Sequence, residues 1–141
     1  MRPRVLLVVF LCLASTFSAQ GQHAANQTEL PSNYVPSGKM MYKQYCAVCH
    51  GIEAKGDGPA SSMLKVPPAD LTTLAKRQGG KFPYEYVSDV LRFGPGPTIL
   101  HGTADMPMWG PIFQFLDKYN ENIVQQRIKN LCDYLASLQE K

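Results

Sequence analysis

Two cysteines and a histidine stand together near the front of this 141-residue chain, in the stretch QYCAVCHG of residues 44–51. The spacing Cys-x-x-Cys-His places the thiols of Cys46 and Cys49 about one helical turn apart, with His50 beside them. Two thiols at that spacing can add to the two vinyl groups on one edge of a porphyrin, and the adjacent imidazole then reaches one face of its iron. The pattern therefore predicts covalent attachment of one c-type haem per chain.

Other chemistry would leave part of the motif without a role. A disulfide between Cys46 and Cys49, or a thioredoxin-like redox pair, does not explain His50, and the sequence lacks the βαβ pattern expected around a redox pair. A tetrahedral zinc site needs four ligands in paired clusters, and Cys132 with His101 makes a poor second pair. Haem attachment uses all three residues.

A second ligand to the iron has to come from far along the chain, and the stretch HGTADMPMWG of residues 101–110 offers three donors. A methionine thioether opposite histidine raises the reduction potential and fills the sixth position, which favours electron transfer over ligand binding. Met106 lies in a loop just before a predicted helix, where Pro107 fixes the backbone. Met106 is therefore the predicted ligand, with Met108 and His101 as alternatives.

The elements that position these residues are expected to be short helices. Ser37 suits the N-cap of a helix over 38–49. Further short helices are predicted over 59–65, 69–78 and 82–93, and from Pro111 onward. No segment shows the alternation of apolar and polar residues that is typical of a strand. The sequence therefore predicts an all-α fold with long loops.

The last helix is the most strongly patterned segment. Asn122, followed by Gln125 three residues later, resembles a capping box. Apolar residues then recur at helical spacing and form one stripe, namely Val124, Ile128, Leu131, Leu135 and Leu138. Short helices and proline-rich loops provide little regular core for this stripe, so a large apolar cofactor would supply the missing contacts.

The first 21 residues are typical of a cleaved signal peptide. Two arginines precede an apolar run of about ten residues, half of what a membrane span needs. Residues 22–36 predict a flexible lead-in, followed by one domain over 37–141. Loss of the two arginines reduces the net charge from +3 to about +1, and no dense basic cluster indicates nucleic-acid binding. The mature chain is expected to be soluble in the periplasm, without stable membrane insertion.

Two segments resemble the class I cytochromes c, in particular the small periplasmic monohaem type: CAVCHGIEAKGDGPA of residues 46–60 and MPMWG of residues 106–110. The likeness covers roughly residues 37–140 and implies the cytochrome c fold, in which short helices and long loops wrap around one covalently bound haem. It also implies that Met106 is the distal ligand and that the carbonyl of Pro59 accepts a hydrogen bond from His50.

The resemblance further implies that the first helix crosses the last one through a glycine and an aromatic residue. Gly38 and Tyr42, facing Tyr134, match this pattern.

Expectations for four other residues complete the candidate site. Trp109 is expected to line the haem crevice and donate its indole N–H to a propionate. Arg92 is expected to neutralise a propionate, with a solvated helix end as the alternative. Cys132 is expected to be a buried small hydrophobe, with a bridge between two chains as the alternative. His101 is expected to be a loop histidine.

These features predict an electron carrier and no enzyme activity. The iron would exchange single electrons with redox proteins that act as donor and acceptor. The alternative is a haem c subunit of a larger dehydrogenase or terminal reductase or oxidase complex. A ligand-binding haem enzyme or sensor would require that Met106 leave the iron open.

Overall fold

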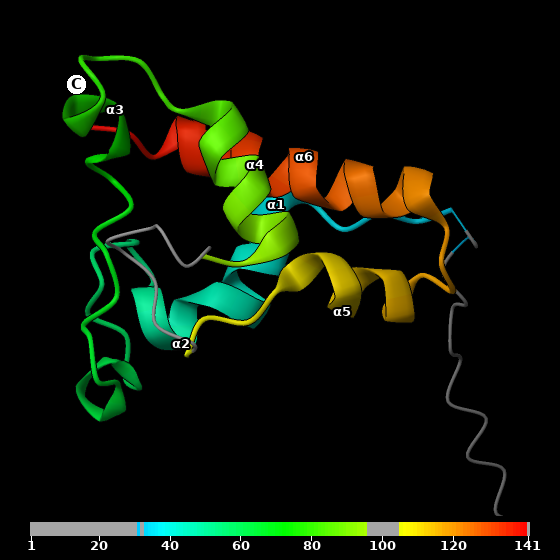
Figure 1. Ribbon diagram of the computed structural model, residues 1–141, viewed down its shortest axis with the longest axis horizontal. Coiled ribbons are helices and arrows are strands. Elements are labelled where there is room, and N and C mark those ends of the chain that lie inside the picture. Colours follow the sequence, from blue (N-terminus) through cyan, green and yellow to red (C-terminus); the bar gives the residue numbers. More distant parts are fainter. Residues whose placement is uncertain (1–30, 32, 96–104, 141) are drawn as a thin grey trace, which may run out of the picture. The chain divides into compact units, whose positions relative to one another are not determined.

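The computed structural model describes residue 31, residues 33–95 and residues 105–140. The expected signal peptide, most of the expected lead-in and His101 lie outside these residues. Every regular element within them is a helix, so the all-α prediction is confirmed (Figure 1). None of the helices described has the length and apolar character needed to cross a membrane.

The attachment motif lies at the end of a continuous helical segment. Helix α1 (Gly38–Met41) begins at Ser37, whose hydroxyl accepts a hydrogen bond from the Met40 amide at 3.3 Å. The chain continues through a wider π-helical turn, η1 (Tyr42–Cys46), into α2 (Ala47–His50). The prediction of a helix over 38–49 is confirmed.

The middle of the chain contains less helix than the sequence predicts. It holds a single 3₁₀ turn, η2 (Ser61–Met63), and one turn of α-helix, α3 (Leu74–Arg77). The helix predicted over 69–78 is wrong in its first half because Asp70 accepts hydrogen bonds from both the amide and the hydroxyl of Thr72, at 2.8 and 2.6 Å. These bonds form a local turn in place of the helix.

Three longer helices complete the frame. Helix α4 (Tyr84–Phe93) is followed by α5 (Trp109–Leu116) and α6 (Glu121–Ser137). Helix α5 begins two residues before Pro111. The capping box predicted at Asn122 is wrong, because Asn120 is the residue that precedes the first turn of α6.

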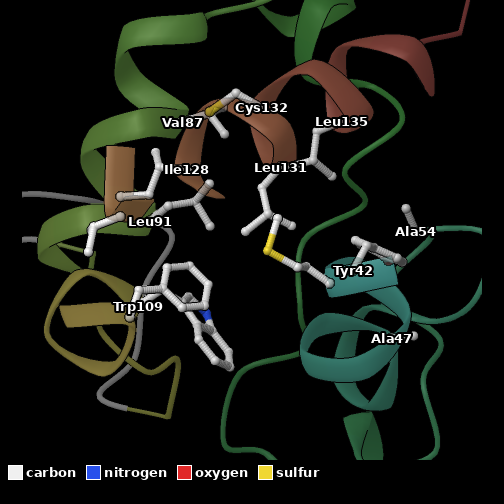
Figure 2. Close-up of a cluster of buried hydrophobic side chains, with 13 residues drawn as sticks. Tyr42, Ala47, Ala54, Val87, Leu91, Trp109, Ile128, Leu131, Cys132 and Leu135 are labelled. Carbon is white, nitrogen blue, oxygen red and sulfur yellow. The ribbon is translucent and has the colours of Figure 1, made fainter. Parts of the chain in front are cut away.

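The core lies on the apolar stripe of α6. Val124, Ile128, Leu131 and Leu135 are buried, as the stripe predicts, and Leu138 is partly buried. Figure 2 shows this stripe together with side chains from the other helices, including Val87, Leu91, Tyr42 and Trp109. The buried residue Cys132 belongs to the same cluster, so the prediction of a small core side chain is confirmed.

Helix α1 crosses α6 at the predicted positions. A Cβ atom at Gly38 would overlap the carbonyl oxygen of Asn130 on α6. The rings of Tyr42 and Tyr134 lie 5.4 Å apart between centroids, tilted by 53°. The absence of a side chain at Gly38 thus allows the two backbones to approach closely.

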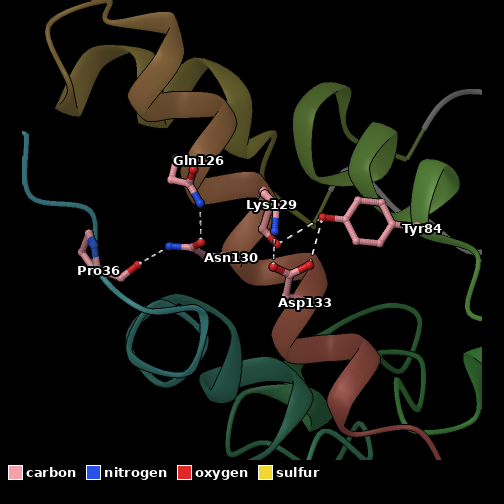
Figure 3. A network of polar contacts seen from close by, with 6 residues as sticks. All are labelled: Pro36, Tyr84, Gln126, Lys129, Asn130 and Asp133. Carbon is pink, nitrogen blue, oxygen red and sulfur yellow. Dashed lines mark hydrogen bonds and ion pairs between the residues drawn. The ribbon is translucent and has the colours of Figure 1, made fainter.

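Polar contacts also hold the frame together. From α6, Asn130 donates to the carbonyl of Pro36 at 3.0 Å, and Asp133 pairs with Lys129 at 2.6 Å (Figure 3). Between α5 and α6, Arg127 and Asp117 form a buried ion pair through two hydrogen bonds of 2.7 Å.

Candidate cofactor cavity

A cavity of about 510 Å³ lies between the motif-bearing helix, α4, α6 and the segment of residues 66–78. Its size is within the range of protein sites for small molecules and cofactors. Most of its wall is aliphatic or aromatic: Tyr42, Val66, Pro67, Pro68, Ala69, Leu71, Leu74, Pro83, Tyr86, Val87, Val90, Leu91, Leu131 and Leu135. Such a wall excludes water and favours a large apolar ligand.

Two residues of the motif face this cavity. Cys46 and His50 are four residues apart, so successive helical turns bring both to the wall, and Cys49 is partly buried on the turn between them. Both cysteines carry free thiols. Burial, with a further contribution from Cys49, raises the pKa of the Cys46 thiol to about 12. Cys46 is therefore protonated at neutral pH in this apolar setting.

His50 is held by a backbone carbonyl, but not by the predicted one. Its Nδ1 lies 3.1 Å from the carbonyl oxygen of Ala69. The carbonyl can only accept, so Nδ1 carries the proton and Nε2 keeps a lone pair for a metal. Burial lowers the pKa of His50, an effect that the hydrogen bond to Ala69 opposes. Burial is the larger of the two effects, so the neutral form of the imidazole is favoured.

Pro59 does not accept a hydrogen bond from the His50 ring because its loop is hydrogen-bonded to backbone carbonyls of the motif-bearing helix. The amide of Ala60 donates to the carbonyl of Val48 at 2.9 Å, and the amide of Gly58 donates to that of Cys49 at 3.1 Å. A Cβ atom at Gly58 would overlap these helical carbonyls. The prediction that Pro59 orients His50 is corrected: Ala69 supplies the carbonyl.

The structure separates the two candidate methionines. Met106 is partly buried, lines the cavity and packs against the core cluster. Met108 immediately precedes α5, is about half exposed, and packs its side chain against Gly94. Met106 is the one that shares a cavity with His50.

Trp109 and Arg92 do not line the cavity. Trp109 is buried between Tyr45 and Phe113, with ring centroids 5.2 and 5.6 Å away. Arg92 pairs with Glu121 at 2.6 Å, which joins α4 to α6. Aromatic packing and this ion pair engage the two side chains, and their contacts with propionates stay predictions.

The cation that does line the cavity is Arg77. Its Nη2 donates to the carbonyl of Asp70 at 2.8 Å, and Gln78 lies next to it on the wall. A guanidinium at the rim of an apolar cavity suits a ligand that carries carboxylates. The only signal for Arg77 in the sequence was the basic stretch AKRQGGK of residues 75–81, which is equally typical of a solvated helix end.

The comparison with known families decides which ligand this cavity suits. The model of the family described as cytochrome C oxidase, cbb3-type, subunit III matches residues 33–135. The chain belongs to this family. It is thus a c-type cytochrome, its all-α architecture is a cytochrome c fold, and the family implies covalently bound haem c with haem-based electron transfer. No curated protein and no solved structure matches the chain significantly.

The residues present fit such a group. The wall offers a thiol for a vinyl group (Cys46), a neutral imidazole (His50), a thioether (Met106) and a cation suited to a propionate (Arg77). When bound, haem c supplies an iron that can take up and release one electron.

Proposed function

We propose that this c-type cytochrome is an exported monohaem carrier of single electrons between redox proteins. The observation that carries the proposal is a single apolar cavity that has Cys46, His50 and Met106 on its wall. In this proposal Cys46 and Cys49 would form the two thioether bonds, and His50 and Met106 would hold the iron.

The chain's own residues would set the properties of the iron. The carbonyl of Ala69 holds the Nδ1 proton of His50, which orients the ring and increases the donor strength of Nε2. The apolar wall would exclude water, and two protein ligands to the iron would favour electron transfer over the binding of exogenous ligands. Arg77 is proposed to pair with a propionate, in the role that the sequence had suggested for Arg92.

The location of the protein is part of the proposal. Residues 1–21 would direct export and be removed, and residues 22–36 would lead into the domain of residues 37–141. Export exposes the chain to an oxidising compartment with haem-attachment machinery. The N-terminal sequence and intact mass of the purified protein test this point: retention of the first 21 residues would contradict it.

The visible spectrum of the full chain, produced in a host that attaches c-type haem, tests the core of the proposal. The wild type should show the sharp reduced α band of a c-type cytochrome and retain haem through acid–acetone extraction. Cys46→Ala should lose one covalent bond, whereas the matched Cys132→Ala should not. A colourless wild type would refute the assignment.

The distal ligand has its own matched pair of variants. Met106→Ala should lose the methionine-to-iron charge-transfer band of the oxidised protein, and Met108→Ala should keep it. The opposite result would assign Met108. A high-spin wild-type iron that binds carbon monoxide readily would favour an enzyme or sensor over a carrier.

The family name favours one alternative, in which the chain is a haem c subunit of a larger terminal oxidase complex. Purification of the protein from its own cells distinguishes the two. A freely diffusing carrier should elute as a small protein, whereas a subunit should remain with a larger enzyme through several steps.

A further inference from the structure

The segment of residues 69–78, which carries the Ala69 carbonyl, packs Leu71 and Leu74 against the core cluster and is also joined to the rest of the protein by hydrogen bonds. At its front, the amide of Leu71 donates to the carbonyl of Ala54 at 2.8 Å. Its only regular element is the single turn of α3, and the rest is held in turns. Its position against the cavity therefore depends on specific polar contacts as well as on packing.

The side chain of Gln139 makes three hydrogen bonds, two of them to this segment and one to α6. Its Oε1 accepts a hydrogen bond from the amide of Ala75 at 2.8 Å. Its Nε2 donates to the carbonyl of Leu71 and to the carbonyl of Leu135 on α6, both at 2.8 Å. The amide thus joins the end of α6 to both ends of the turn formed by residues 71–75.

The neighbouring residue adds a fourth contact. The backbone amide of Glu140 donates to the carbonyl of Thr72 at 2.9 Å. The two consecutive residues therefore hold the turn from one side, while Ala54 holds Leu71 from the other.

The segment that Gln139 holds also contacts His50, through a backbone carbonyl. Leu71 lies only two residues beyond Ala69, the residue whose carbonyl accepts from His50 Nδ1 at 3.1 Å. We infer that Gln139 is a positioning residue for His50: it fixes the segment that presents the Ala69 carbonyl and so tunes the donor strength of the imidazole. The inference rests on the proposed function, in which His50 binds the iron.

The chemistry of the position requires a carboxamide. One acceptor is needed for the Ala75 amide, and two donors are needed for the Leu71 and Leu135 carbonyls. A glutamate would keep the acceptor but lose both donors and place a negative charge against two carbonyl oxygens. Alanine would lose all three bonds.

The experiment compares Gln139→Ala and Gln139→Glu with the control Gln126→Ala in the holoprotein. Gln126 lies on α6, and its Nε2 makes a single exposed hydrogen bond, to Asn130 at 2.8 Å. The reduction potential is measured by redox titration, and the exchange rate of the His50 Nδ1 proton by NMR of the reduced protein.

Both Gln139 variants should show a higher reduction potential and faster exchange of this proton, because a weaker hydrogen bond makes the imidazole a poorer donor to ferric iron. Gln126→Ala should match the wild type in both. Gln139→Glu preserves the side-chain size and the Ala75 contact, so it provides the readout if Gln139→Ala yields no holoprotein.

An unchanged potential and exchange rate in the Gln139 variants, even with reduced stability towards denaturant, would overturn the inference and leave a purely structural role. Failure of the proposed function is a different result, since the wild type would then lack a covalently bound, histidine-ligated haem.

Discussion

The two sides of the cavity are built in different ways. The helical frame of α1, α4 and α6 holds its side by burying a continuous set of apolar side chains. The segment of residues 69–78 packs Leu71 and Leu74 against this core and is further held by hydrogen bonds with Ala54, Gln139 and Glu140. Changes of volume or of buried charge should therefore damage the frame most, whereas loss of single polar groups should act on the segment and on the properties of His50.

The largest effect is expected in the frame, from loss of a buried charge. Asp117→Ala leaves Arg127 buried without its partner and should destabilise the protein by about 3–5 kcal/mol. The control Asp133→Ala breaks an exposed pair with Lys129 and should cost less than about 1 kcal/mol. Denaturant unfolding of both variants measures the difference. Equal losses of unfolding free energy in the two variants would show that burial of the Asp117 pair is unimportant for stability.

Overpacking of the crossing between α1 and α6 should have the next largest effect. Gly38→Ala places a Cβ atom on the carbonyl of Asn130 and should destabilise the protein by about 1–3 kcal/mol. Lys39→Ala, at the next and exposed position, should change stability by less than about 0.5 kcal/mol. A similar unfolding midpoint for the two variants would mean that the helices can separate at no cost.

A smaller effect is expected from a polar deletion in the segment. Thr72→Val removes the hydroxyl bond to Asp70 at nearly constant volume and should cost about 1 kcal/mol. Hydrogen exchange should accelerate at the amides of Leu71 and Ala75, while amides in the middle of α6 stay protected. Uniform acceleration throughout the protein would show that the segment and the frame open together.

The smallest effect concerns pH. The hydrogen bond from the Thr72 hydroxyl lowers the pKa of Asp70 below its usual value of 3.8. A lowered pKa in the folded state means that the unfolded chain binds the proton more tightly, so this contribution is present above pH 3.8 and is lost as the pH falls through the folded pKa. NMR titration should therefore show a higher Asp70 pKa in Thr72→Val; an unchanged value would remove Thr72 as the cause.

The helical frame could be predicted from the sequence because the spacing of apolar residues along a helix indicates which side chains are buried. The stripe from Val124 to Leu135 faces the core, and Gly38, Tyr42 and Tyr134 meet where the helices cross. Each of these features depends on residues whose size and spacing allow few ways of packing the helices.

The segment could not be predicted in the same way. Asp70 and Thr72 look compatible with a helix until their side chains take the hydrogen bonds of a turn. The carbonyl expected from Pro59 comes from Ala69, and the arginine on the cavity wall is Arg77, for which we propose the propionate contact expected of Arg92. Every residue type has a backbone carbonyl, so the sequence does not show which carbonyl contacts His50. Nor does the sequence show which arginine lines the cavity.

The sequence separation between Gln139 and its partners has a consequence for biosynthesis. Gln139 follows Leu71 by 68 residues. Because a ribosome adds roughly 5–20 residues per second, the residues of the turn are synthesised several seconds before the side chain that anchors them. Cys46 and Cys49 are made earlier still. The growing chain therefore passes through a stage in which both thiols exist and the segment of residues 69–78 is not yet held by Gln139.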